Sequence, residues 1–195
     1  MTKKNLILFG FILLKFILQY VLISPEYDLQ RDEYLHLDQA HHLAWGYLSV
    51  PPVTSWFSYI ILLLGNSVFW VKFFPALFGA LTLLIVWKTI ELLKGNLYAL
   101  ILGALCVLLS CLLRLNMLYQ PNSFDVLCWT ALYYVLIQYL TSENTKWLYF
   151  GAVIFALGFL NKYNIVFLLF GLVPAILLSQ QRKILAKKEF YFALI

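Results

Sequence analysis

Long apolar stretches recur along most of this chain, and short polar breaks separate them. A helix needs about 20 consecutive apolar residues to cross the hydrocarbon core of a bilayer. The stretches that reach or approach this length predict about six complete spans in the 195 residues. The predicted spans are residues 5–23, 70–93, 97–113 and 124–140, two helices within 147–179 that divide at 161–164, and the start of a seventh in 190–195.

The composition excludes a soluble globular domain. Hydrophobic residues make up 63% of the chain and charged residues 12%, whereas a soluble domain has about 45–50% apolar and about 25% charged residues. The net charge of +5 is scattered between apolar stretches and forms no dense basic face, so it does not indicate nucleic-acid binding. We therefore expect an all-α, polytopic transmembrane helical bundle, embedded in lipid.

The stretch 51–64 is short for a crossing, and the distribution of basic residues decides how we interpret it. If this stretch lies at the interface, nine Lys and Arg residues are cytoplasmic and four are outside, with Lys15 inside the membrane. That asymmetry follows the positive-inside rule, and a crossing helix would weaken it. We therefore predict an extracytoplasmic loop over residues 25–56, with 114–125 and 161–164 on the same side.

Acidic residues gather on this outer side. Within the loop, residues 31–45 read as an interfacial amphipathic helix that ends at Gly46, and Pro51-Pro52 restarts helix. Six of the nine acidic residues are predicted to lie on the extracytoplasmic side: Glu26, Asp28, Asp32, Glu33, Asp38 and Asp125.

Asp32 and Glu33 allow two interpretations. Acids in the first turn of a helix are favoured by the helix dipole, by about 0.3–1 kcal/mol. A carboxylate at the membrane surface can instead act as a general base that takes a proton from an acceptor hydroxyl. The position of the pair in an outward-facing loop favours the catalytic interpretation.

Asp125 and Lys162 are further candidates, each at an outer end of a predicted span. Asp125 could support the helix dipole, or orient substrate hydroxyls or a basic side chain. Lys162 could extend to the outer headgroups, or neutralise a lipid-linked phosphate as it leaves. Arg31 and Arg114 are weaker candidates for the phosphate.

Three histidines, His36, His41 and His42, raise the question of a metal site. A solvated or hydrogen-bonded role is favoured, because a ligand set at helical spacing would need an acid such as Asp32 or Asp38 to complete it. A divalent cation could still join through substrate phosphate oxygens, as is common for magnesium. The metal requirement is left open.

Five segments stand in order along the chain: Arg31-Asp32-Glu33-Tyr34, His41 to Tyr47, Pro51-Pro52-Val53, Asn122 to Leu127, and Leu160-Asn161-Lys162-Tyr163. Together they resemble the GT-C glycosyltransferases, and specifically the dolichyl-phosphate-mannose protein mannosyltransferase-like group, which includes bacterial lipid A aminoarabinose transferases. The likeness spans nearly the whole chain. Ser49 and Val50 stand where the aminoarabinose transferases have an acidic-basic pair.

This resemblance implies an inverting hexosyl or pentosyl transfer from a polyprenyl-phosphate donor to a lipid, glycan or protein hydroxyl. It implies that Asp32 is the catalytic base and that Glu33 completes the acidic pair. Asp125, Lys162 and Tyr163 match polar positions near the donor pocket. It also implies a cell-envelope enzyme of the bacterial inner membrane whose active site faces outward. Because relatives continue through more spans, we expect residues 1–195 to be the N-terminal portion of such a domain.

Two other functions remain open from the sequence. A transporter or flippase fragment would use Lys15, Asn161 and Lys162 to line a path, since ionisable residues in spans are functional candidates. A transporter, however, should concentrate its charges near the midplane rather than in a surface loop. A scaffold subunit without chemistry would tolerate loss of all the candidate residues.

Overall fold

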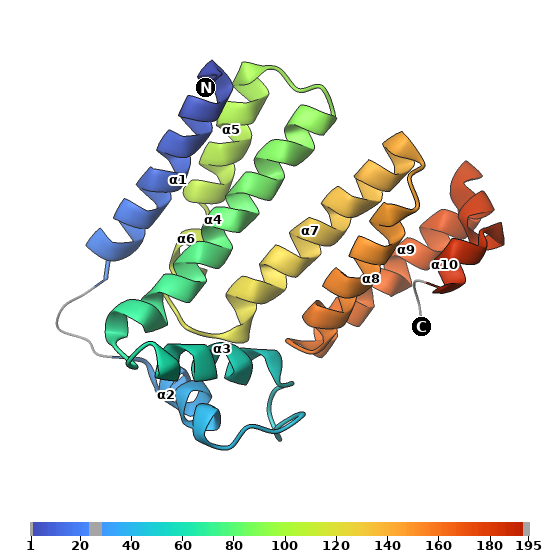
Figure 1. The fold of residues 1–195 in the computed structure, drawn as a ribbon. Coiled ribbons are helices and arrows are strands. Elements are labelled where there is room, and N and C mark those ends of the chain that lie inside the picture. The colour runs from blue at the N-terminus through green and yellow to red at the C-terminus, as the bar shows by residue number, and fades with distance from the viewer. Residues whose placement is uncertain (1, 24–28, 193–195) are drawn as a thin grey trace.

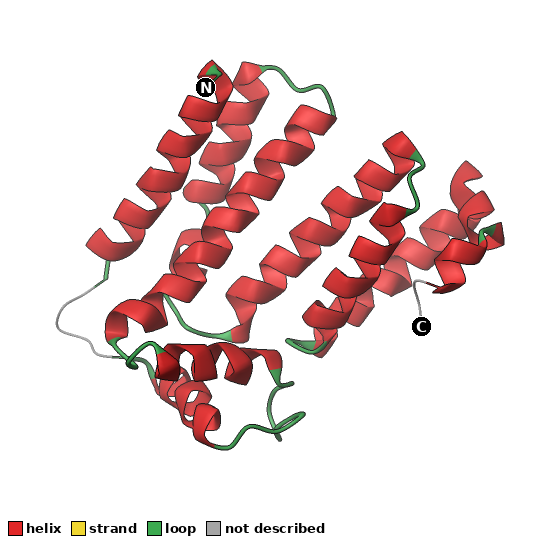
Figure 2. Ribbon diagram, in the orientation of Figure 1, coloured by secondary structure: helices red, strands yellow, loops and turns green. Residues whose placement is uncertain are grey.

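The computed structural model describes residues 2–23 and 29–192, and every regular element within them is a helix (Figure 2). The expected all-α membrane bundle is therefore confirmed. Glu26 and Asp28, predicted in the outer loop, lie outside the described residues, as do the last three residues of the predicted seventh span. The elements in chain order are α1 (Lys3–Val21), α2 (Arg31–Asp38), η1 (Gln39–His41), α3 (Val53–Leu63), α4 (Val68–Leu92), α5 (Leu97–Leu108), α6 (Leu112–Leu115), α7 (Pro121–Ser142), α8 (Lys146–Phe159), η2 (Tyr163–Ile165), α9 (Val166–Leu178), η3 (Gln180–Ala186) and α10 (Lys188–Phe192).

Three helices, α1, α4 and α7, are long and apolar enough to cross a membrane by themselves. A fourth span is possible by length if η2–α9 and η3 count as one bent segment, whose two parts meet at 106°. The helices α3, α5 and α8 are apolar but shorter. The predicted number of about six spans stays a prediction.

The bundle is organised around α4. Helices α1 and α5 pack on one side of α4, α7 packs on another, and α8 packs against α7 (Figure 1). The short helices α2 and α3 lie across the end of this bundle, with α3 crosswise to α4 and α7 (Figure 1). That orientation agrees with the predicted interfacial, non-crossing role of residues 51–64.

Two apolar clusters hold the helices together. Leu8, Leu83 and Trp87 belong to a buried cluster between α1, α4 and α5. Phe74 and Phe78 of α4 belong to a second cluster, which joins α4 to α3 and α7. Because α3 contributes to this second cluster, the layer formed by α2 and α3, called the α2–α3 layer below, is fixed to α4 and α7.

The predicted helix over residues 31–45 is wrong in length. Regular α-helix ends at Asp38, and one turn of 3-10 helix follows to His41. The Tyr47 hydroxyl lies 2.9 Å from the His42 carbonyl oxygen and accepts the Ala44 amide at 3.2 Å. This side chain therefore satisfies backbone groups that a longer helix would have paired internally.

The predicted span 97–113 also ends early, at Leu108. The Ser110 hydroxyl donates to the Val107 carbonyl at 3.0 Å and accepts the Leu112 amide at 3.2 Å. A side chain that bonds the backbone on both sides replaces helical hydrogen bonds there. The chain consequently turns into the short helix α6.

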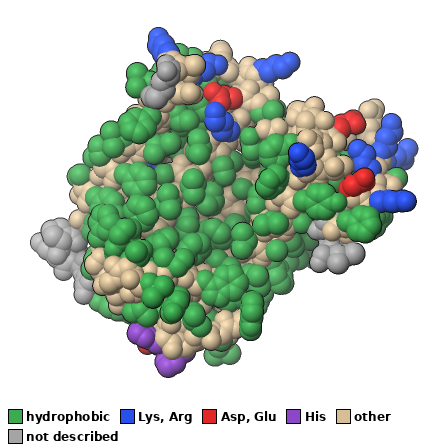
Figure 3. Space-filling model, viewed as in Figure 1, with side chains coloured by type: hydrophobic (Ala, Val, Ile, Leu, Met, Phe, Trp, Pro, Cys, Tyr) green, Lys and Arg blue, Asp and Glu red, His purple; other side chains and the backbone are tan. Residues whose placement is uncertain are grey.

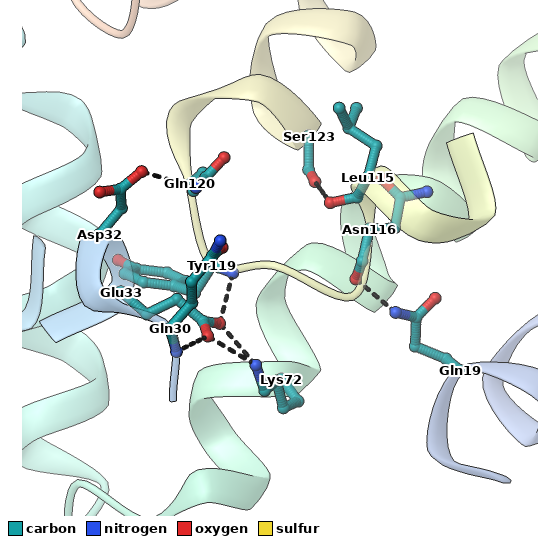
Figure 4. Close-up of polar contacts among 10 residues, drawn as sticks. All are labelled: Gln19, Gln30, Asp32, Glu33, Lys72, Leu115, Asn116, Tyr119, Gln120 and Ser123. Atoms are coloured by element: carbon teal, nitrogen blue, oxygen red, sulfur yellow. Dashed lines mark hydrogen bonds and ion pairs between the residues drawn. The ribbon is translucent and has the colours of Figure 1, made fainter. Parts of the chain in front are cut away.

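Lys15, predicted from the sequence to lie inside the membrane, is buried within the bundle. Its side chain is only 1% exposed, and its ammonium donates to Gln19 Oε1 at 3.0 Å. Gln19 donates in turn to the carbonyl of Asn116, which precedes α7 (Figure 4). A chain of polar contacts thus satisfies the buried charge, as a low-dielectric interior requires.

Candidate active site

Glu33 anchors the α2–α3 layer to the bundle. Its carboxylate accepts Lys72 Nζ of α4 at 2.6 and 2.8 Å, the Tyr119 amide at 2.7 Å and the Gln30 amide at 2.8 Å (Figure 4). The side chain is 0% exposed. A substrate hydroxyl therefore has no free access to it. The contacts with Lys72 and Tyr119 tie α2 to α4 and to the segment before α7, and the contact with Gln30 caps α2 itself.

Asp32, the preceding residue, is placed differently. Its side chain is 42% exposed, and its Oδ2 accepts Gln120 Nε2 at 3.2 Å (Figure 4). Arg31 lies 3.4 Å from Oδ1, but its side chain is 93% exposed. Asp32 thus combines a fixed position with an open face, which a general base requires.

Two neighbouring hydrogen bonds join α2 to the segment before α7. Glu33 binds the backbone of Tyr119, and Asp32 binds the side chain of Gln120 (Figure 4). Consecutive residues on one segment therefore bind consecutive residues on the other. The buried hydrogen bond of Glu33 fixes the separation of the two segments, and the exposed hydrogen bond involves Asp32, the candidate base.

Further hydrogen bonds connect the Asp32–Gln120 contact to Lys162. Gln120 Oε1 accepts Asn122 Nδ2 at 3.1 Å, and Asn122 Oδ1 accepts Lys162 Nζ at 2.8 Å. A hydrogen-bonded chain therefore runs from the Asp32 carboxylate through two amides to the Lys162 ammonium. Its members come from the start of α2, the start of α7 and the turn between α8 and α9.

Asp125 lies one turn into α7 and is 7% exposed. Its Oδ2 accepts Asn164 Nδ2 at 2.9 Å, so it also connects α7 to the α8–α9 turn. Its Oδ1 is buried without a hydrogen bond within the described residues. A buried carboxylate oxygen of this kind can accept a further donor, because leaving it unpaired is costly.

Buried hydrogen bonds also connect the segments that carry these groups. The Tyr119 hydroxyl lies 2.9 Å from Ser58 Oγ and donates to the Thr54 carbonyl at 2.8 Å. Asn161 accepts Thr54 Oγ1 at 3.2 Å and donates to the Pro121 carbonyl at 2.9 Å. Burial raises the pKa of Tyr119, so its hydroxyl stays protonated as a donor.

His36 is buried under the site rather than exposed to substrate. Burial lowers the pKa of His36, against the smaller opposing effects of Gln39, Asp32 and Glu33. Its ring is therefore neutral at pH 7. Among the described residues, no group of three or more His, Cys, Asp and Glu side chains could hold a metal ion.

The structure connects some of the predicted site residues by hydrogen bonds and leaves others at the surface beside them. Asp32 and Lys162 share one hydrogen-bonded chain, and Asp125 reaches the same turn through Asn164. Arg31 lies beside Asp32 at the surface. Tyr163 is 58% exposed and packs on Phe159 with a ring separation of 5.0 Å.

Sequence reasoning missed three residues that build the site. Lys72 carried a usable signal, because an ionisable residue at the start of a span is a functional or structural candidate by default. Asn122 belongs to a segment that carries the family resemblance, but sequence reasoning assigned it no role of its own. Gln120 carried no signal, since a single amide before a helix has many ordinary roles. Their importance follows only from contacts between segments distant in sequence.

The sequence profile of the dolichyl-phosphate-mannose-protein mannosyltransferase family matches residues 49–195. The chain belongs to this family. It is accordingly an integral membrane protein of a glycosyltransferase family, and the resemblance seen in the sequence is confirmed. The match to the mannosyltransferase family includes Asp125, Lys162 and Tyr163, and it begins after Asp32 and Glu33. No curated protein and no solved structure matches the sequence at a significant level.

Proposed function

We propose that this protein transfers a sugar from a polyprenyl-phosphate donor to an acceptor hydroxyl, with inversion at the anomeric carbon. The observation that carries the proposal is the hydrogen-bonded chain from Asp32 to Lys162. A carboxylate and an ammonium held in one polar chain match the two needs of the reaction. The Asp32 carboxylate takes the proton of the acceptor hydroxyl, and the Lys162 ammonium stabilises the departing phosphate.

Asp32 is the base in this proposal. Its open oxygen takes the proton of the acceptor hydroxyl while that oxygen attacks the anomeric carbon. A new glycosidic C–O bond forms, and the bond from the anomeric carbon to the donor phosphate breaks. The electron pair of the broken bond leaves with the polyprenyl phosphate. Glu33 takes a positioning role, because its burial and four contacts hold Asp32 in place.

Lys162 stabilises the phosphate in this proposal. Its ammonium has one short contact, to Asn122 Oδ1, and two further N–H groups for phosphate oxygens. Electrostatic stabilisation of a developing charge in a fixed site is worth several kcal/mol, roughly 3–4 for one donor. Arg31 and Tyr163 flank the site at its surface, and Asp125 orients Asn164 and the turn that carries Lys162.

The site faces outward in this proposal, across a bacterial inner membrane. The charge asymmetry of the loops supports this orientation, because nine basic residues lie at the opposite end of the predicted spans. The acceptor is a hydroxyl of a lipid, glycan or protein. A divalent cation, if one takes part, would bind through the donor's phosphate oxygens.

The test is sugar transfer by the full-length protein from a polyprenyl-phosphate sugar donor. Asp32→Asn should lower kcat by about 10²–10⁴, the usual contribution of a general base. An Asn side chain can still accept from Gln120, so the fold should be preserved, and tryptophan fluorescence checks this. Asp38→Asn, on the exposed side of the same helix, is the matched control and should keep wild-type activity. Wild-type kcat in Asp32→Asn would refute the assignment.

A further inference from the structure

A large apolar cavity lies between α7, α8 and α9. It has a volume of about 600 Å³ and is lined mainly by the second half of α7, by α8 and by α9. Tyr139 and Trp147 lie at the end of the cavity where α7 gives way to α8. Because α8 has 14 residues, this end is separated from the Lys162 turn by about 20 Å.

The chain carries basic residues directly over this end of the cavity. After α9 the backbone turns by 106°, and the segment that follows contributes Ile184 and Phe190 to the lining. Lys187, between them, places its ammonium 5.4 Å from the centre of the Tyr139 ring. Tyr139 itself lines the cavity, so the cation lies at its boundary.

The charge of this end is strongly positive. Figure 3 shows basic side chains gathered at this end of the molecule beside a few acidic ones. Five basic residues against two acidic ones give a local net charge of +3. The basic residues are Lys146, Arg182, Lys183, Lys187 and Lys188, and the acidic residues are Glu143 and Glu189.

We infer that the cavity binds an anionic phospholipid of the cytoplasmic leaflet. One acyl chain occupies the apolar space between α7, α8 and α9, and the phosphate lies against Lys183 and Lys187. Apolar lining and a basic rim at the cytoplasmic end of a bundle are the chemistry that such lipids require. The size of the cavity falls within the usual range for ligand sites, about 300–1,000 Å³. This inference does not depend on the proposed transfer reaction.

Trp147 provides the measurement, because it lines the cavity. The full-length protein is reconstituted in phosphatidylcholine vesicles that contain brominated phosphatidylglycerol, whose bromine atoms quench nearby tryptophan. The signal of Trp147 is the difference between wild type and Trp147→Phe. Brominated phosphatidylglycerol should quench this signal at much lower membrane content than brominated phosphatidylcholine does.

Four variants separate the effect of charge from the effect of cavity shape. Lys183→Gln and Lys187→Gln should each weaken the preference for phosphatidylglycerol by about fivefold, the effect of one basic residue near an anionic surface. Lys94→Gln, in the turn between α4 and α5, is the matched control and should change it by less than twofold. Ala152→Phe, which fills the cavity, should abolish quenching with every charge in place.

Three results would overturn the inference. Equal quenching by the two brominated lipids would remove the charge recognition. Absence of quenching by either lipid would mean that protein covers the cavity in the full chain. Displacement of brominated phosphatidylglycerol by polyprenyl phosphate, and not by unlabelled phosphatidylglycerol, would assign the cavity to the donor's tail instead.

Discussion

Removing the ammonium of Lys72 should weaken the attachment of the α2–α3 layer to the bundle and so lower the free energy of unfolding. The substitution Lys72→Met keeps an unbranched side chain that is one atom shorter and deletes its charge. Glu33 would keep its two backbone amide donors but would remain a buried carboxylate without a counter-charge. Breaking a buried ion pair in this way costs about 3–5 kcal/mol of unfolding free energy.

The same helix provides a control ion pair with a similar distance between charges. Lys88 lies 2.8 Å from Glu91 on α4, close to the 2.6 Å between Lys72 and Glu33. The Lys88 side chain is 43% exposed, whereas that of Lys72 is 8% exposed. Because solvent screens the exposed pair, Lys88→Met should cost less than about 1 kcal/mol.

The assay is unfolding of the purified protein in mixed micelles of dodecyl maltoside and SDS, followed by tryptophan fluorescence. The double variant Lys72→Met/Glu33→Gln removes both charges and should recover part of the loss, because no unpaired charge remains. A cost for Lys72→Met no larger than that for Lys88→Met would refute the view that this buried pair fixes the layer.

Two further predictions concern packing and pH. Gly79→Ala should destabilise the protein by about 1–3 kcal/mol in the same assay, because its Cβ would lie 2.1 Å from Asn116 Nδ2 and 2.7 Å from Lys15 Cε; Gly10→Ala, with nothing within 4 Å, should stabilise it slightly. Burial lowers the pKa of His36, so its stabilising neutral form is complete above the unfolded pKa of about 6.5 and stability is lost as pH falls below that value. His36→Gln should flatten this acid limb of the stability curve, and an unchanged limb would contradict the assignment.

The membrane class and the outer loop could be predicted because both depend on local properties of the chain. The length of an apolar stretch sets a span, and the loop positions of basic residues set its orientation. The same reasoning placed Asp32 and Lys162 at one end of the bundle. The family match later showed that the chain belongs to a membrane glycosyltransferase family, while the roles of Asp32 and Lys162 stay predictions.

The role of Glu33 could not be predicted, because its partners are distant in sequence. Lys72 is 39 positions away and the Tyr119 amide is 86 positions away. An acid in the first turn of a helix has the same local pattern whether it is exposed or buried. Only tertiary contacts distinguish the exposed Asp32 from its buried neighbour.

The helix ends were predicted poorly for a related reason. Residues 31–45 have a continuous amphipathic pattern, yet Tyr47 binds the backbone of residues 39–44 and ends the helix early. Likewise Ser110 ends α5 within an apolar stretch. Single hydroxyl groups decide these boundaries, and hydrophobic patterns do not register them.

Thiol labelling tests most directly whether the Asp32 carboxylate and the Lys162 ammonium face the same side of the membrane. Arg31→Cys and Tyr163→Cys place exposed thiols beside Asp32 and Lys162, in a background with Cys106, Cys111 and Cys128 replaced. In sealed right-side-out vesicles, a membrane-impermeant maleimide should modify both thiols, while a cysteine at Lys94 should react only after the vesicles are opened. Reaction of the first two thiols from opposite faces would contradict the shared site.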